Sequence, residues 1–297
     1  MADRGRKNTV IVALLAVMGV GLWACSEPSP DPLFLELRSI RAAVREKAAG
    51  KLVLYGEQIV PRLIEESQSE FIRVRFEVAR ILGRIKDPRA TDTLIRLLDD
   101  RSFNVAQYAA WGLGEIQAPT AVPALLPHLA TPSKGFRAQV VAALGRCYDD
   151  TVHALLRDSL VSVVAASLRD PTPKVRIAAL QSARLFGYQG MEEALIRLSR
   201  DPAAEVRHVA VQALGQAGAG LVPGSAGPLS GQERANVVEA LVAALDEPFQ
   251  SIRTKAVRSL EQIGAPEAAT ALHRLRAVGT EVDRREARRV LESLGAS

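Results

Sequence analysis

The histidines and cysteines are the side chains of this sequence that could bind a metal ion or act as nucleophiles. The histidines are far apart, at His128, His153, His208 and His273. None forms an HExxH motif, none lies beside a cysteine at metal-ligand spacing, and no His-Glu dipeptide occurs. A GxSxG motif and phosphate-binding or dinucleotide-binding glycine patterns are also missing. We therefore expect no catalytic residue, no metal site and no cofactor, and we expect that the chain is not an enzyme.

The triplet Val206-Arg207-His208 belongs to a repeat rather than to an isolated chemical site. Similar stretches begin at eight anchor residues, which are Val44, Val74, Val105, Phe136, Val175, Val206, Ile252 and Asp283. The steps between them are 30, 31, 31, 39, 31, 46 and 31 residues. Apolar residues usually recur 4, 8 and 11 positions after each anchor, which places them on one helix face. Second apolar segments lie between the copies, so each period is predicted to be a pair of helices.

The turns between the predicted helices carry recurrent proline signals, such as "KDPRA", "QAPTA" and "GAPEA" after the anchored helix. Together with the Val-Arg and Ala-Leu-Gly marks, they make the unit similar to the HEAT repeat in its short, phycobilisome-lyase-like variety. The resemblance covers nearly all of residues 33–297. It implies an all-α fold, a right-handed α-solenoid of about seven helix pairs in which each pair packs only on its neighbours. Cys147 falls at a core position of its helix and is predicted to be a buried hydrophobe rather than a reactive thiol.

An arginine follows most anchors, and an acidic residue often stands five positions before the anchor. The arginines are Arg45, Arg75, Arg137, Arg176, Arg207, Arg253 and Arg284, and the acidic residues are Asp100, Asp170, Asp201 and Glu247. In the HEAT family such pairs form a ladder that links adjacent repeats, and partly buried, charge-assisted pairs could stabilise these helix starts. A row of anion-binding sites is the alternative. Ala106 interrupts the row.

Two repeats contain extra residues. Eight follow Phe136, where residues 151–168 keep helical spacing, so we expect a longer helix that protrudes by about two turns. Fifteen follow Val206 and are rich in glycine, proline and serine, which predicts a mobile loop over residues 218–230. This loop is either a tolerated insertion or a hinge or contact segment.

The N-terminus has the features of a secretory signal. Arg4, Arg6 and Lys7 precede the apolar run over residues 9–22, which is shorter than a membrane span. Leu22-Trp23-Ala24-Cys25 then resembles the lipobox of bacterial lipoproteins, in which the cysteine is diacylated and becomes the first mature residue. An ordinary signal peptide with an incidental cysteine is the alternative.

The lipobox resemblance implies three segments and a location. Residues 1–24 would be the signal peptide, residues 25–32 the lipidated Cys25 and its tether, and residues 33–297 the repeat domain. By the same resemblance, Ser26 implies the outer membrane of a bacterial envelope, facing the periplasm. The lipid would be the contact with the membrane.

The charge of the chain argues against a nucleic-acid partner. The formal net charge is +5, and loss of residues 1–24 lowers it to about +3, because three cations and Asp3 are removed. Nucleic-acid binding requires a basic stripe, which this mild excess does not indicate. After lipidation of Cys25 only Cys147 remains, so no intramolecular disulfide can form.

The third repeat offers a candidate partner-binding surface. Its residues on the helix face opposite the core are Tyr108, Trp111 and Glu115. Most other repeats have a mixture of residue types at these positions. The candidate site adds three arginines of the neighbouring repeats, Arg80, Arg84 and Arg146. Tyrosine, tryptophan and arginine are enriched at binding hot spots. The alternative is that Trp111 fills the space left where Ala106 replaces an arginine.

These observations favour a lipid-anchored envelope scaffold that binds another protein. The alternative is an enzyme or enzyme accessory that resembles the phycobilin lyases, which are built on similar repeats. Export argues against that alternative, because the chemistry of those enzymes belongs to the cytoplasm. A third possibility is a purely structural component of an envelope assembly.

Overall fold

The structure is a computed structural model that describes residues 29–188, 190–222 and 227–296. These residues form helices, turns and bends and contain no strand. The described chain divides into two compact units, one ending at Tyr55 and one beginning at Gly56. The first unit holds α2 (Asp31–Glu36) and α3 (Ala42–Leu54). Helix α2 begins inside the expected tether, and the expected signal peptide and Cys25 lie outside the described residues.

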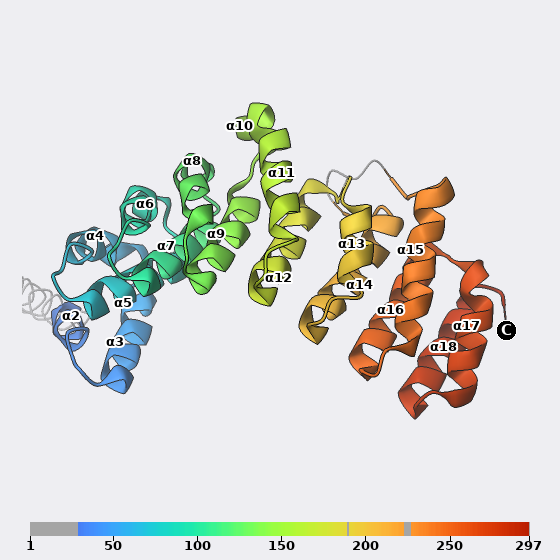
Figure 1. The fold of residues 1–297 in the computed structure, drawn as a ribbon. Helices are drawn as coiled ribbons and strands as arrows, with labels where there is room; N and C mark the ends of the chain where they lie inside the picture. The colour runs from blue at the N-terminus through green and yellow to red at the C-terminus, as the bar shows by residue number, and fades with distance from the viewer. Residues whose placement is uncertain (1–28, 189, 223–226, 297) are drawn as a thin grey trace, which may run out of the picture. The chain divides into compact units, whose positions relative to one another are not determined.

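The second unit alternates anchored helices with shorter covering helices (Figure 1). The anchored helices are α5 (Ile72–Ile85), α7 (Phe103–Ile116), α9 (Lys134–Cys147), α12 (Pro173–Ala183), α14 (Ala204–Gly218), α16 (Gln250–Ile263) and α18 (Glu281–Ser293). The covering segments are η1 (Gly56–Ile59), α4 (Val60–Glu66), η2 (Pro88–Ala90), α6 (Thr91–Leu97), η3 (Pro119–Ala121), α8 (Val122–Leu125), η4 (Leu126–Ala130), α10 (Asp150–His153), η5 (Ala154–Leu156), α11 (Arg157–Ser167), α13 (Glu192–Leu198), α15 (Gly231–Ala243), η7 (Ala244–Asp246), η8 (Pro266–Ala268) and α17 (Ala269–Val278). The short η6 (Arg184–Phe186) continues the anchored helix α12.

The helical period of the sequence corresponds to the buried core of the second unit. Each anchored helix packs against the next one along the chain, from α5 to α18. Val74, Val78 and Leu82 of α5 are fully buried. Ala256 and Leu260, which follow the anchor Ile252 by four and eight positions in α16, are fully buried as well. The all-α solenoid of helix pairs is thus confirmed.

The extra residues after Phe136 do not form one long helix, contrary to expectation. Residues 150–167 are divided into α10, η5 and α11. The Asp149 side chain accepts hydrogen bonds from the Thr151 and Val152 amides and so starts α10. The break falls at His153, whose backbone leaves the helical conformation (φ −112°, ψ 19°) before η5. The expected protrusion is therefore a compact helical turn placed before α11.

The second insertion joins α14 to α15, and its residues 223–226 lie outside the described part. The described flanks fold against α14, because the Leu229 amide donates to the Gly218 carbonyl at 3.1 Å. Val222 is buried. No described helix is long and apolar enough to cross a membrane.

Candidate functional site

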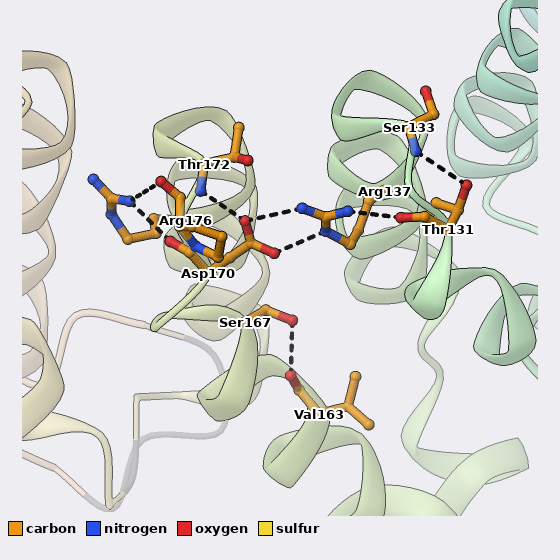
Figure 2. Close-up of polar contacts among 9 residues, drawn as sticks. Thr131, Ser133, Arg137, Val163, Ser167, Asp170, Thr172 and Arg176 are labelled. Carbon is orange, nitrogen blue, oxygen red and sulfur yellow. Dashed lines mark hydrogen bonds and ion pairs between the residues drawn. The ribbon is translucent and has the colours of Figure 1, made fainter.

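The predicted arginine ladder is present and fixes the spacing of the repeats. Arg137 of α9 reaches Asp170, which lies just before α12, with Nε 2.8 Å from Oδ2 and Nη2 3.2 Å from Oδ1 (Figure 2). Its Nη1 donates to the Thr131 carbonyl at 2.6 Å, at the turn before its own helix. Equivalent pairs join Arg75 to Asp100, Arg176 to Asp201 and Arg207 to Glu247. Arg253 pairs with Asp283, which is the anchor residue of α18 and not the residue five positions before it. These arginines are structural links between neighbouring repeats rather than a row of anion sites.

The ladder carboxylates are well partnered. Burial disfavours the charged form of Asp170, but the hydrogen bonds from Arg137 and from the Thr172 amide outweigh it and hold the pKa of that carboxyl below its usual value. The same balance lowers the pKa of Asp100 and of Asp283.

One rung is missing, between α7 and α9. Ala106 stands at the arginine position and Thr131 at the acidic position, so both partners are replaced together. Aromatic packing takes their place, because the Phe103 and Phe136 rings lie 6.5 Å apart and His128 lies 5.2 Å from Phe136. This junction is instead linked by charges at the opposite ends of the helices.

Those charges centre on Glu115 near the end of α7. Its carboxylate accepts from Lys86 Nζ at 2.6 Å and from Arg146 Nη1 at 2.8 Å. Lys86 follows α5 in a left-handed conformation (φ 62°), and Arg146 lies in the last turn of α9. One carboxylate therefore joins three successive repeats.

A hollow of about 870 Å³ opens beside this triad. Its lining includes Lys86, Glu115, Arg146, Tyr148, Asp150 and Arg184. Its floor is made of small residues, because the helices approach closely there: a Cβ built at Gly145 would lie 2.9 Å from Ser182 Cα. The hollow therefore combines small residues at a close helix contact with charged side chains in its lining.

Tyr148 and the two aspartates after it give the hollow its acidic side. The Tyr148 hydroxyl donates to Asp150 Oδ1, and burial together with this hydrogen bond raises the pKa of Tyr148 to about 12. The phenol therefore stays protonated at neutral pH. Hydrogen bonds from Thr151 and Val152 lower the pKa of Asp149. The hollow thus offers cations for acidic groups of a ligand and carboxylates for N–H groups.

The structure brings together only some of the six residues predicted to bind a partner. Glu115 and Arg146 form an ion pair, and the Tyr108 and Trp111 rings lie 6.0 Å apart. Arg80 instead pairs with Glu77 of its own helix, and Arg84 is exposed.

Trp111 packs between repeats, but against α5 and not in the space at Ala106 that the packing alternative expected. Its ring lies on Gly83 of the preceding anchored helix, since a Cβ at Gly83 would be 2.6 Å from Trp111 Cζ3. The ring therefore packs toward α5, whereas the missing rung at Ala106 faces α9. Tyr108 extends the same contact by an edge-on approach to Phe76, with ring centroids 4.7 Å apart.

Sequence reasoning missed Lys86, Tyr148, Asp150 and Arg184. The repeat period could have indicated the contact between Lys86 and Glu115. Lys86 precedes Glu115 by about one period, just as Glu115 precedes Arg146 by 31 residues. The extra residues after α9 were the signal for Tyr148 and Asp150. No group of three or more His, Cys, Asp or Glu side chains in the described residues is placed to hold a metal ion.

Comparison with known proteins identifies the repeat. Residues 30–104, 91–165 and 161–229 match the family of HEAT repeats. The chain belongs to the HEAT-repeat family. Residues 252–275 of this HEAT-repeat protein also match the PBS lyase HEAT-like repeat.

One curated relative and two solved structures are similar to this chain. The phycocyanobilin lyase subunit alpha of Synechococcus elongatus is 34% identical over 154 residues, which cover 49% of this chain and 55% of the relative. The match thus spans about half the length of that relative. YibA of Escherichia coli has a TM-score of 0.57 at 14% identity, with 88% of this chain and all of that chain covered. The complex of CpcE and CpcF of phycocyanin lyase from Nostoc has a TM-score of 0.48 at 20% identity, with coverage of 90% and 94%.

The match to a lyase subunit corrects one expectation. The absence of familiar catalytic motifs led us to expect that the chain is not an enzyme, and that expectation is wrong, because the matching relative is a subunit of a lyase. The motifs tested belong to hydrolases, metalloenzymes and nucleotide-binding enzymes. Their absence says nothing about a lyase built on helical repeats.

Proposed function

We propose that the chain is a subunit of a lyase-type enzyme that acts, with a protein partner, on an open-chain tetrapyrrole. The observation that carries this proposal is the 34% identity with a phycocyanobilin lyase subunit. The earlier alternative of a phycobilin-lyase-like enzyme or accessory is therefore preferred over a scaffold without activity.

The hollow supports the proposal through its size and chemistry. An open-chain tetrapyrrole carries carboxylate side chains and pyrrole N–H groups. Lys86, Arg146 and Arg184 stand at the rim and can pair with the carboxylates. Asp150 can accept from the pyrrole N–H groups. A volume of about 870 Å³ lies within the range of small-molecule sites.

The residues of the hollow have separable roles in this proposal. Arg146 is partly used by Glu115, so its Nη1 is committed while the guanidinium keeps further donors. Arg184 is exposed at the rim and provides a charge for the ligand. The protonated Tyr148 hydroxyl holds Asp150 in place and keeps it beside the ligand.

The test measures binding of biliverdin to the full chain by the change in its absorption spectrum. Arg184→Gln should weaken binding by about tenfold, because a charge-assisted hydrogen bond is lost. Arg285→Gln, an exposed arginine on α18 that lies outside the hollow, is the matched control. Absence of binding, or equal binding by both variants, would reject the hollow as the ligand site.

The location of the protein is a separate proposal. The order of charged, apolar and LWAC residues supports a chain that is lipidated at Cys25 and held on a bacterial envelope membrane, on the periplasmic side of the outer membrane. Mass spectrometry of the mature N-terminus tests it, because an intact Met1 or an unmodified Cys25 would contradict it. A protein at this location would have to bind its bilin outside the cytoplasm. Lipidation of Cys25 and binding of the bilin therefore need independent tests.

The protein partner is also part of the proposal. HEAT repeats present successive exposed helix faces, and Tyr108, Glu115 and Arg146 lie on the face beside the hollow. A partner that covers this face would close the hollow over its ligand.

A further inference from the structure

Among the described residues, no other repeat has a helical segment as long as α10 and η5 between the end of its anchored helix and its covering helix. These two elements occupy residues 150–156, between the end of α9 and the start of α11, and we name them the α10–η5 knob. Figure 1 shows it at one end of α11, above the row of anchored helices. The extra residues of this repeat therefore build a separate surface feature.

The knob is firmly attached to the repeats beneath it. His153 is buried, and its Nδ1 accepts a hydrogen bond from the Asp149 amide at 3.1 Å. Because Nδ1 accepts, Nε2 carries the proton and donates to the Pro119 carbonyl at 3.0 Å, in the turn after α7. The Tyr148 ring stacks near His153 at 5.9 Å. One imidazole thus ties the knob to two repeats.

The apolar side chains of the knob point away from this attachment. Leu155 is 99% exposed, Val152 is 61% exposed and Leu156 is 37% exposed. Short amphipathic helices in a folded domain place such residues toward the core. Here a buried histidine holds the turn, and three aliphatic side chains are left within five residues on the outside.

Acidic residues flank the apolar tip on both sides in the sequence. Asp150 and Asp158 are exposed and Asp149 is partly exposed, whereas Arg157 is the basic residue of the segment from 149 to 158. Arg157 lies 4.0 Å from Asp150 and offsets one of these charges. The knob therefore combines an apolar centre with a net negative rim.

We propose that the α10–η5 knob docks into an apolar groove with a lysine or arginine rim on a partner protein. The apolar centre supplies the buried contact, and the acidic rim selects a basic surface by charge complementarity. This docking role goes beyond the proposed bilin chemistry, because the apolar centre of the knob and Asp158 lie outside the lining of the hollow, although Asp149 and Asp150 also line it.

The charge of the knob decides against two other occupants. An anionic membrane surface would repel Asp149, Asp150 and Asp158. A symmetric contact between the knobs of two copies would bring like charges together, which is unfavourable. A basic-rimmed protein groove satisfies both the apolar and the acidic part.

The test places a photo-crosslinking amino acid at position 155 of the full chain in its native cells, with position 278 as the matched control. Val278 is also an exposed aliphatic residue, 78% exposed at the end of α17, far along the chain from the knob. We expect a protein adduct at 155 and not at 278, with the crosslinked peptide apolar and flanked by lysine or arginine. A zero-length carbodiimide crosslink from Asp158 should join the same partner through a lysine.

Affinity measurements with the partner so identified complete the test. Leu155→Ser should weaken binding by about tenfold or more, because burial of the leucine is lost. Asp158→Asn should weaken it by about twofold to fivefold at low salt and reduce its salt dependence. Both sites are exposed, so unchanged melting temperatures are expected and would exclude unfolding as the cause.

Several results would overturn the proposal. One is that position 155 forms adducts only with lipid, only with a second copy of the chain or only with an acidic segment. Others are that positions 155 and 278 form equal adducts, or that position 155 forms none. Unchanged affinity of Leu155→Ser would do the same. Because the hollow variants are tested with biliverdin alone, failure of the bilin proposal and failure of the docking proposal are distinguishable.

Discussion

Trp111 lies directly on Gly83, and this contact sets the approach of α5 to α7. A Cβ at Gly83 would be 2.6 Å from Trp111 Cζ3 and 2.8 Å from the Gly112 Cα. Neither distance is possible for a real methyl group, so the glycine is required by the close packing of the two helices. The indole therefore belongs to the repeat junction as well as to the exposed face.

The first prediction concerns this junction. Gly83→Ala should destabilise the fold by about 1–3 kcal/mol, because the added methyl group must displace the indole and the Gly112 backbone. Trp111→Ala should destabilise it by about 2 kcal/mol, less than a fully buried tryptophan, because the ring is only half-buried. Urea denaturation of both variants measures these values.

A double-mutant cycle separates the two neighbours of the added methyl group. In the Trp111→Ala background, Gly83→Ala should cost less than in the wild type, since only the Gly112 contact remains. If Trp111→Ala melts normally but loses its protein partner, the ring is a binding residue and the packing interpretation is wrong.

The second prediction concerns the ladder. Arg137→Gln should destabilise the fold by about 2 kcal/mol, because Asp170 is left partly buried without its cation and the Thr131 carbonyl loses a donor. Arg169→Gln is the matched control, because that arginine is exposed next to Asp170. Equal melting of the two variants would show that the rung contributes nothing.

The third prediction follows from the lowered pKa of Asp100, Asp170 and Asp283. The unfolded chain binds protons at a higher pH than the folded chain, so each carboxylate stabilises the fold above its unfolded pKa of about 3.9. This stability is lost as the pH falls through the folded pKa. The free energy of unfolding should therefore be nearly constant above about pH 5 and fall below about pH 4.

The Asp170→Asn variant tests the assignment of this acid sensitivity. It should be less stable at neutral pH and should lose less stability than the wild type on acidification. An identical pH profile of variant and wild type would assign the acid transition to other carboxylates.

The sequence predicted the repeat architecture because each period repeats the same local pattern. Val206, Ala210 and Leu214 follow the spacing of Val74, Val78 and Leu82, and all six are fully buried. The ladder pairs were predictable for the same reason, since Arg176 and Asp201 occupy fixed positions in consecutive repeats.

The candidate site was less predictable because it depends on departures from the period. Tyr148 and Asp150 lie where other repeats have a proline turn, and nothing local indicates that they meet Arg184 across a hollow. The Trp111 contact required knowledge of which neighbour faces Gly83. The break in the long insertion depended on His153, whose partner Pro119 lies one repeat earlier.

The fourth prediction concerns Cys147, which was expected to be a buried hydrophobe and is 1% exposed. Burial raises the pKa of its thiol to about 12, and Sγ donates to the Leu113 carbonyl at 3.3 Å. The thiolate is the reactive form, so Cys147 should not react with a disulfide reagent at pH 8 while the protein is folded. The Cys25→Ser variant makes this measurement specific, because Cys147 is then its single cysteine. Labelling should begin only in denaturant and should follow the loss of helical circular dichroism. Rapid labelling of the folded variant would mean that the end of α9 opens and exposes the thiol beside the hollow.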